Sequence, residues 1–361
     1  MDRTEANSGT RDIPERLRFD VAALEAWMSA NVAGFTGPLI VSQFKGGQSN
    51  PTYRLDMPSV QDSPQRAFVL RRKPPGTLLP GAHAVEREAR VMSALGTSGF
   101  AVPRVHGLCE DAGVIGTPFF VMDLVEGRII WDPAFPGMEP ASRAAHFDAM
   151  NATIAALHSV DPAAIGLTDY GRPLAFVERQ VARWSKQYGS DTDAGRLPQM
   201  DALVDWLGTH LPPDRGDARV VHGDFRCDNM IFAADEARVA AVLDWELSTL
   251  GDPVADFVYH LMMYRMPAGL FSGIAGLDLA ALGIPDEAAY VAAYCRRTGR
   301  EMLPDFDYLT VFVLFRLASI IHGIKGRLAR GTASSAHAAA MIGHLEPIAD
   351  LALAQMRAAR F

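Results

Sequence analysis

The sequence has few cysteines and no excess of basic charge. Its 361 residues include only three cysteines (Cys109, Cys227 and Cys295), without CxxC or metal-ligand spacing. A disulfide framework is therefore not indicated, and a reducing, cytoplasmic location is expected. The net charge of −8 argues against nucleic-acid and membrane partners, although a local basic pocket for phosphates is compatible with it. Nothing in the composition indicates the oligomeric state.

The chain also has no uninterrupted apolar run typical of a signal peptide or a membrane span. Residues 1–20, "MDRTEANSGTRDIPERLRFD", are charged throughout and have no apolar core, which argues against a secretory signal. The most apolar late stretch, residues 308–327, is interrupted by Arg316, His322 and Lys325. We therefore expect a buried helix there rather than a membrane span.

The first third of the chain has the pattern of an antiparallel sheet. A composition of 49% hydrophobic and 21% charged residues is that of a globular protein, and the length suits about two domains. A glycine-containing turn joins the expected strands 38–44 and 52–57, and strand 66–73 extends this hairpin. A helix is expected over 83–96, and residues 118–127 are expected to be a buried strand that runs into a connection ending at Gly127.

Beyond Gly127 the hydrophobic spacing becomes helical. Phe147, Met150, Ile154 and Leu157 recur at steps of three and four, which predicts an amphipathic helix ending near His158. Further helices are expected over 174–187, 254–264, 287–298, 308–329 and 335–358. The sequence thus predicts an α+β fold with two lobes. Residues 1–127, with an N-terminal helical extension, form a small β-rich lobe, and 128–361 form a larger helical lobe.

The stretch "VHGDFRCDNMIF" (221–232) concentrates polar side chains between apolar ends. The chain then reads as a hairpin, "MIF", "AADEA" and "RVAAVL", followed by Asp244. Because a hairpin brings its two open ends together, Asn229 and Asp244 should be neighbours, with Asp224 on the loop leading in. Hard oxygen ligands suit Mg²⁺, which completes its coordination with phosphates and water. A second carboxylate would then be available to orient or deprotonate a hydroxyl.

The combination "HGDFRCDN … LDWE … GDPVADF" resembles the aminoglycoside phosphotransferase and choline kinase family, relatives of the protein kinases. It is most similar to the phosphotransferase-like domains found fused to acyl-CoA dehydrogenases. The resemblance implies a protein-kinase-like fold in which Asp224 is the catalytic base and Asn229 and Asp244 bind Mg²⁺. "DWE" stands where kinases have DFG, and Asp228 could compete with Asn229 or add a carboxylate.

The resemblance also implies a nucleotide site in the first lobe. Gly46, Gly47, Gln48 and Ser49 would cover the phosphates of ATP, since glycines let backbone N–H groups approach closely. Taken alone, such a glycine pair is more often only a hairpin turn.

Arg71 falls where kinases place the phosphate-binding lysine, with Lys73 on the same strand face as the alternative. Glu88 is the first candidate for its helix partner and Glu86 the second. An exposed charge cluster would explain either pair in isolation.

The connection between the lobes is expected to hold the nucleobase. Met122 would shape the adenine pocket, and Asp123 and Val125 would offer main-chain contacts, although plain core packing explains such apolar residues equally well.

Four other polar residues are expected to be structural. Asp252 precedes Pro253 as a helix N-cap, and Asp256 is also interpreted as a structural residue. His222 should brace the loop, and His158 should be a hydrogen-bonded core histidine.

The predicted function is that of an ATP- and Mg²⁺-dependent small-molecule kinase, which transfers the γ-phosphoryl group to a hydroxyl. The acceptor is either a hydroxylated acyl or other metabolic compound or, given the negative net charge, an aminoglycoside. Two other functions stay open. A non-catalytic nucleotide-binding protein of this fold would not need Asp224, Asn229 and Asp244 together. A metal-dependent phosphohydrolase would release phosphate without an acceptor and would not need the N-terminal glycine loop.

Overall fold

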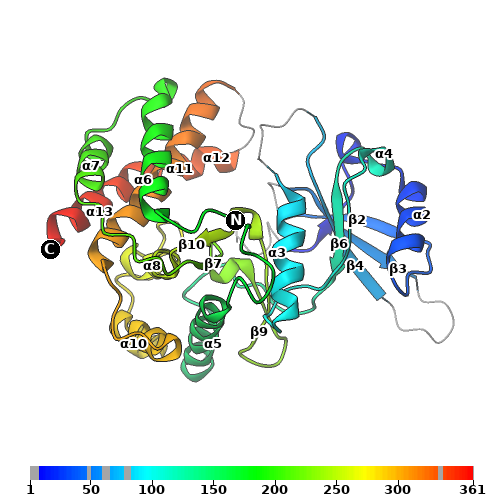
Figure 1. The fold of residues 1–361 in the computed structure, drawn as a ribbon, viewed down its shortest axis with the longest axis horizontal. Coiled ribbons are helices and arrows are strands. Elements are labelled where there is room, and N and C mark those ends of the chain that lie inside the picture. Colours follow the sequence, from blue (N-terminus) through cyan, green and yellow to red (C-terminus); the bar gives the residue numbers. More distant parts are fainter. Residues whose placement is uncertain (1–7, 47–49, 59–65, 77–82, 332–335, 361) are drawn as a thin grey trace. The chain divides into compact units, whose positions relative to one another are not determined.

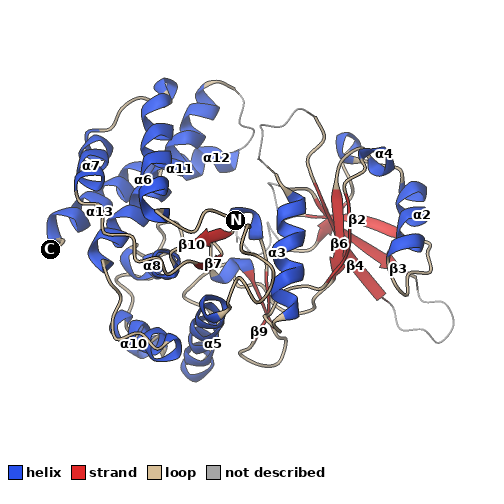
Figure 2. Cartoon of the chain, in the orientation of Figure 1, coloured by secondary structure: helices blue, strands red, loops and turns tan. Residues whose placement is uncertain are grey.

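The computed structural model describes residues 8–46, 50–58, 66–76, 83–331 and 336–360 (Figures 1 and 2). Two compact units are distinguished by their internal contacts. Unit 1 contains Met1–Trp131, Ala163–Leu167 and Asp228–Ser248, and unit 2 contains Asp132–Pro162, Thr168–Cys227 and Thr249–Phe361. Each unit is therefore built from segments far apart in sequence. The predicted division into lobes 1–127 and 128–361 stays a prediction.

Unit 1 is organised around a six-stranded sheet in which every neighbouring pair is antiparallel. The strands lie in the order β1-β2-β3-β4-β6-β5. They are β1 (Thr10–Arg11), β2 (Ile40–Phe44), β3 (Thr52–Met57), β4 (Arg66–Arg72), β5 (Val105–Cys109) and β6 (Phe119–Asp123).

Alternation along the strands sorts the side chains onto two covered faces. In β4, Phe68 and Leu70 belong to a buried cluster with Leu24 and Met28 of helix α2 (Val21–Asn31). Val69 and Arg71 point to the opposite face. Figure 1 shows α2 and α3 (Val85–Thr97) on opposite sides of this sheet. Because both faces of the sheet are covered, a charged side chain on the α3 side, such as Arg71, is buried away from water.

A second, smaller piece of unit 1 is the predicted hairpin. Strand β8 (Met230–Phe232) pairs antiparallel with β9 (Val239–Val242). The hairpin follows the 3₁₀ turn η3 (Cys227–Asn229) and leads through Asp244 into η4 (Trp245–Leu247). Trp245 packs edge-on against Phe100, just beyond α3. These contacts place the start of η4 beside the α3 segment.

Unit 2 is mostly helical and is centred on α11 (Phe306–Ala329), which packs against α6, α7, α8, α12 and α13. By length and composition α11 could cross a membrane, but 78% of its most apolar window is buried inside the protein, as is typical of a core helix. The other helices are α5 (Pro140–Ser159), α6 (Phe176–Ser190), α7 (Pro198–Thr209), α8 (Pro253–Arg265), α9 (Leu279–Leu282), α10 (Glu287–Thr298), α12 (Ala336–Ile342) and α13 (Leu345–Ala358).

Unit 2 differs from the sequence-based expectation in several features, and its helices α7 and α9 were not predicted. The single helix predicted over 335–358 is wrong: Gly343 and His344 separate α12 from α13, because a glycine weakens a helix even when the apolar spacing continues. A two-stranded sheet of β7 (Arg219–Val221) and β10 (Thr249–Gly251) was not predicted. Its strands are too short for a visible period of two.

The described residues also contain three short helical elements not given above. They are η1 (Glu15–Leu17), α4 (Ala112–Ile115) and η2 (Thr192–Ala194).

Candidate phosphoryl-transfer site

Arg71 is the centre of a buried charge cluster in unit 1. Its Nε lies 2.8 Å from Glu88 Oε2 on α3, and its Nη2 lies 2.7 Å from Asp244 Oδ1. Arg71 is only 8% exposed. One planar guanidinium thus contacts two carboxylates that lie far apart in sequence, Glu88 and Asp244, which suits the forked geometry of arginine. Lys73 instead pairs with Glu86, at 2.9 Å and in a more exposed position.

Glu88 is held by a second neighbour that sequence reasoning missed. The Asn50 side chain donates from Nδ2 to Glu88 Oε1 at 2.7 Å, and its Oδ1 lies 3.0 Å from His83 Nδ1. Burial raises the pKa of Glu88 to about 7, although the Arg71 charge opposes this rise. Only the position of Asn50 just after the predicted phosphate loop could have indicated this contact.

The hairpin brings Asn229 and Asp244 to adjacent positions, as expected. The Leu243 N–H donates to the Asn229 carbonyl at 2.8 Å, so the residue before Asp244 is bonded directly to Asn229. Asp244 has a φ of +65°, a conformation that is strained for a residue with a Cβ and is often found at functional sites. Its side chain is 34% exposed and can therefore reach a ligand.

The oxygen donors of Asn229 and Asp244 fit magnesium. In the described part of the chain, no group of three or more His, Cys, Asp or Glu side chains could hold a metal ion. An ion bound by one carboxylate and one carboxamide would complete its coordination with phosphate oxygens and water, which is how Mg²⁺ is commonly held. The donor set therefore suits an ion that arrives with a nucleotide.

Asp224 lies in unit 2 and has polar side chains as neighbours. The Tyr259 hydroxyl of α8 donates to Asp224 Oδ1 at 2.5 Å, and Arg226 Nε lies 3.4 Å from the same oxygen. Burial would raise the pKa of Asp224, but the Arg226 charge and the Tyr259 hydrogen bond outweigh it and hold this pKa below its usual value. The carboxylate is therefore ionised at neutral pH.

The backbone of the loop before Asp224 is fixed by another aspartate. Asp256 accepts the N–H groups of His222 and Gly223, at 2.9 and 2.8 Å, and contacts His158 Nε2 at 3.2 Å. His222 Nδ1 in turn accepts the Asp224 N–H at 3.1 Å. The structural interpretations of Asp256, His222 and His158 are thus confirmed.

Asp252 has the predicted capping role. Its side chain accepts the N–H groups of Val254 and Ala255, and Pro253 opens α8.

The remaining nucleotide residues are described only in part. Gly46 lies at a bend after β2, whereas Gly47, Gln48 and Ser49 lie outside the described residues. Met122 is buried in β6. The Asp123 N–H donates to the backbone carbonyl of Arg104, so a contact from Asp123 to a nucleobase must use another atom of Asp123. Val125 follows β6 and is half-buried.

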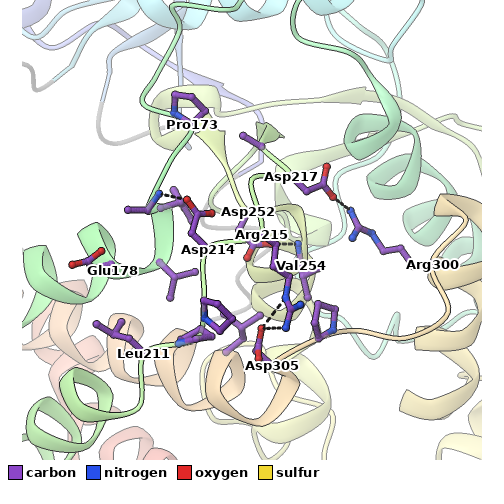
Figure 3. A pocket seen from close by; sticks show the side chains of 18 residues that line it. Pro173, Glu178, Leu211, Asp214, Arg215, Asp217, Asp252, Val254, Arg300 and Asp305 are labelled. Carbon is purple, nitrogen blue, oxygen red and sulfur yellow. Dashed lines mark hydrogen bonds and ion pairs between the residues drawn. The ribbon is translucent and has the colours of Figure 1, made fainter.

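A cavity of about 90 Å³ in unit 2 is lined by none of the predicted catalytic, nucleotide-binding or metal-binding residues. Figure 3 shows its charged lining, in which Arg215 pairs with Asp305 and Arg300 with Asp217. Asp214 accepts the Ala175 N–H at the start of α6. The acidic and basic groups here largely satisfy one another, which indicates a structural role.

The α+β fold, with Asp224 in "HGD" and Asp244 before "WE", is that of a kinase-like phosphotransferase. Residues 40–308 match the model of the phosphotransferase enzyme family, and the chain belongs to this family. A crystal structure of an inferred aminoglycoside phosphotransferase from Ralstonia eutropha is similar to this chain, with 48% sequence identity and a TM-score of 0.86. The match covers 95% of this chain and 100% of that one.

Another solved structure supports the same fold, and two curated proteins are similar to this chain in sequence. Choline kinase from Cryptosporidium parvum has a TM-score of 0.57 over 94% of this chain and 99% of its own, at 10% identity. Acyl-CoA dehydrogenase family member 10 of Mus musculus is 42% identical over 95% of this chain and member 11 of Rattus norvegicus is 39% identical over 95%. The chain spans 32% and 44% of these two relatives.

Proposed function

We propose that this protein transfers the γ-phosphoryl group of ATP to a hydroxyl of a small molecule, with Mg²⁺ bound to the triphosphate. The observation that carries the proposal is the Arg71 cluster. A buried guanidinium joins Glu88 of α3 to Asp244, the carboxylate that would meet the metal. A cluster with only a structural role would not need a strained, partly exposed aspartate at its open end.

In this reaction the oxygen of the acceptor forms a bond to the γ-phosphorus while the bond to the ADP oxygen breaks. Asp224 orients the acceptor hydroxyl and accepts its proton. Arg71 neutralises and orients the phosphates, while Glu88 holds the guanidinium in place. Asn229 and Asp244 hold the ion, which supplies further charge neutralisation when bound. Catalysis of this type consists mainly of positioning and electrostatic stabilisation.

The surroundings of Asp224 favour a neutral or anionic acceptor. Arg226 and Arg316 both lower the pKa of this carboxyl by their charge, and two guanidinium groups repel a polycationic aminoglycoside. Tyr259 also lines a small apolar cavity, together with Met262, Met263 and others. We therefore propose a metabolic alcohol with an apolar portion as the acceptor, in preference to an antibiotic.

A thermal-shift titration with ATP and Mg²⁺, together and separately, tests the nucleotide site. Saturation at about 100 times the Kd should stabilise the protein by roughly 2.7 kcal/mol. The shift should require magnesium and should be lost in Asp244→Ala. In the absence of any nucleotide-dependent shift, the proposed function would be wrong.

Turnover of ATP with hexanol, 3-hydroxybutyrate, choline and kanamycin then tests the acceptor. We expect phosphorylation of the neutral or anionic alcohols, and Asp224→Ala should lower kcat by about 10²–10⁴-fold with little change in ATP affinity. Phosphorylation of kanamycin alone would contradict the proposed acceptor class. Equal phosphate release without any alcohol would indicate a phosphohydrolase.

A further inference from the structure

Apart from lining the small cavity, Tyr259 has no part in the reaction proposed above, yet its hydroxyl is hydrogen-bonded directly to the carboxylate of Asp224. It lies on α8 and is 4% exposed, and its hydroxyl donates to Asp224 Oδ1 at 2.5 Å. Burial and the nearby Asp224 charge raise the pKa of Tyr259 well above its usual value. The phenol therefore stays protonated and donates this hydrogen bond throughout the neutral pH range.

Arg316 of α11 holds the Tyr259 ring and the loop backbone together. Its guanidinium lies over the Tyr259 ring, 4.9 Å from the centroid, and its Nη2 donates to the Gly223 carbonyl at 2.7 Å. Trp184 of α6 lies near the same guanidinium, with its ring centroid 5.9 Å from Arg316 Cζ. Side chains from three helices therefore fix the hydroxyl of Tyr259 relative to the residue that precedes Asp224.

We propose that Tyr259 is a positioning residue for phosphoryl transfer, which fixes the orientation of the Asp224 carboxylate and favours its ionised form. This inference rests on the proposed function, because it assigns Asp224 the role of base. A carboxylate that rotates freely would present its oxygens to the acceptor hydroxyl in many directions, whereas a short, charge-assisted hydrogen bond selects one.

Tyr264 provides a matched comparison on the same helix. It is also buried, and its hydroxyl donates to the backbone carbonyl of Pro285 at 3.0 Å. Tyr264→Phe removes a buried tyrosine hydrogen bond of the same kind from α8 without touching Asp224. Tyr259→Phe keeps the ring beneath Arg316 and removes only the donor to the carboxylate. The two variants therefore separate loss of a buried hydrogen bond from loss of the contact to Asp224.

The sign of the electrostatic effect follows from the groups that face Asp224. These are Tyr259 from α8, Arg316 from α11, and His222 and Arg226 from its own loop. Each of them favours the ionised carboxylate. Removal of the phenol leaves the three others and takes away one hydrogen bond to the charged form. The pKa of Asp224 should therefore rise.

The experiment is a carboxyl-carbon NMR titration of the full chain labelled with ¹³C-carboxyl aspartate. Asp224→Asn identifies the signal. In Tyr259→Phe the midpoint of Asp224 should rise by roughly one pH unit, and in Tyr264→Phe it should not change. An unchanged midpoint in Tyr259→Phe, or equal shifts in both variants, would overturn the inference. This readout needs neither nucleotide nor acceptor.

Turnover with the best alcohol of the panel above tests the positioning role itself. Tyr259→Phe should lower kcat by roughly tenfold or more with unchanged KM for ATP, and the acidic limb of its pH profile should move to higher pH. Wild-type kcat in Tyr259→Phe would refute the positioning role. If the wild-type protein fails to bind MgATP, the proposed function fails, while the NMR titration still decides whether Tyr259 controls Asp224.

Discussion

At the scale of single residues, the geometry of Arg71 explains why an arginine occupies this position. Its Nε and Nη2 reach Glu88 and Asp244 at the same time. An ammonium group is a compact charge with no fixed fork, so it cannot reproduce both contacts with the same geometry. The identity of this cation therefore affects both the stability of unit 1 and the placement of Asp244.

Arg71→Lys should be destabilising even though the charge is kept. Loss of one hydrogen bond between charged, buried partners should lower the free energy of unfolding by roughly 1.5–3 kcal/mol. Lys73→Arg, just beyond the end of the same strand, is the control, because its pair with Glu86 is partly exposed and should change stability by less than about 1 kcal/mol. Urea denaturation of both variants measures the difference. Equal stabilities would show that the fork of Arg71 contributes nothing specific.

At the scale of elements, Gly127 joins the sheet of unit 1 to the hairpin of β8 and β9. It has a φ of +155°, and a Cβ at this position would lie 2.2 Å from the Phe232 carbonyl oxygen. The next residue, Arg128, exchanges backbone hydrogen bonds with Phe232 at 2.8 and 2.9 Å. Only a glycine allows the connection to approach the end of β8 this closely.

Gly127→Ala should therefore destabilise unit 1 more than an ordinary loop substitution does. The added Cβ clashes with rigid backbone, and we expect a loss of at least about 2 kcal/mol. Gly137→Ala is the matched control, since Gly137 has a φ of +78° but no atom within 4 Å of the added Cβ. It measures backbone strain without the clash. Thermal denaturation that ranks the two variants equally would contradict this explanation.

Local patterns predicted many of the elements, although not β5, α7, β7 or β10, because periodicity and turn chemistry act over short distances. The strand 52–57 coincides with β3 and the helix 287–298 with α10, and the hairpin before Asp244 joins its ends as expected. The α+β, kinase-like fold that the loop residues implied is confirmed.

Contacts between distant segments were out of reach of such patterns. The bond from Tyr259 to Asp224 was not visible, because a polar residue on an apolar helix gives no indication of its partner. The pairing of Arg71 with Asp244 likewise depends on which face of β4 is covered.

At the scale of the whole molecule, unit 2 buries several ionisable groups whose protonation is linked to folding. His260 of α8 is 4% exposed and lies between the Phe225 carbonyl, 3.0 Å from Nδ1, and the Tyr290 hydroxyl, 2.8 Å from Nε2. A neutral imidazole satisfies both neighbours by donating from one nitrogen and accepting at the other. Burial lowers the pKa of His260 from 6.5 to about 4.

The stability of unit 2 should consequently fall as the pH decreases from about 6.5 to 4. In this range the unfolded chain binds a proton at His260 that the folded chain does not, so protonation favours unfolding. The contribution of this residue is complete above pH 6.5 and corresponds to roughly 3 kcal/mol at its full extent. Urea denaturation at several pH values should show a smaller loss toward pH 4 in His260→Gln than in the wild type. Exposed His210, at the end of α7, is the control, and His210→Gln should keep the wild-type dependence. A wild-type pH dependence in His260→Gln would mean that acid unfolding begins at other groups. The buried Asp256 would then be the next residue to test. Protonation of its carboxyl at lower pH would weaken the hydrogen bonds that it accepts from the N–H groups of His222 and Gly223.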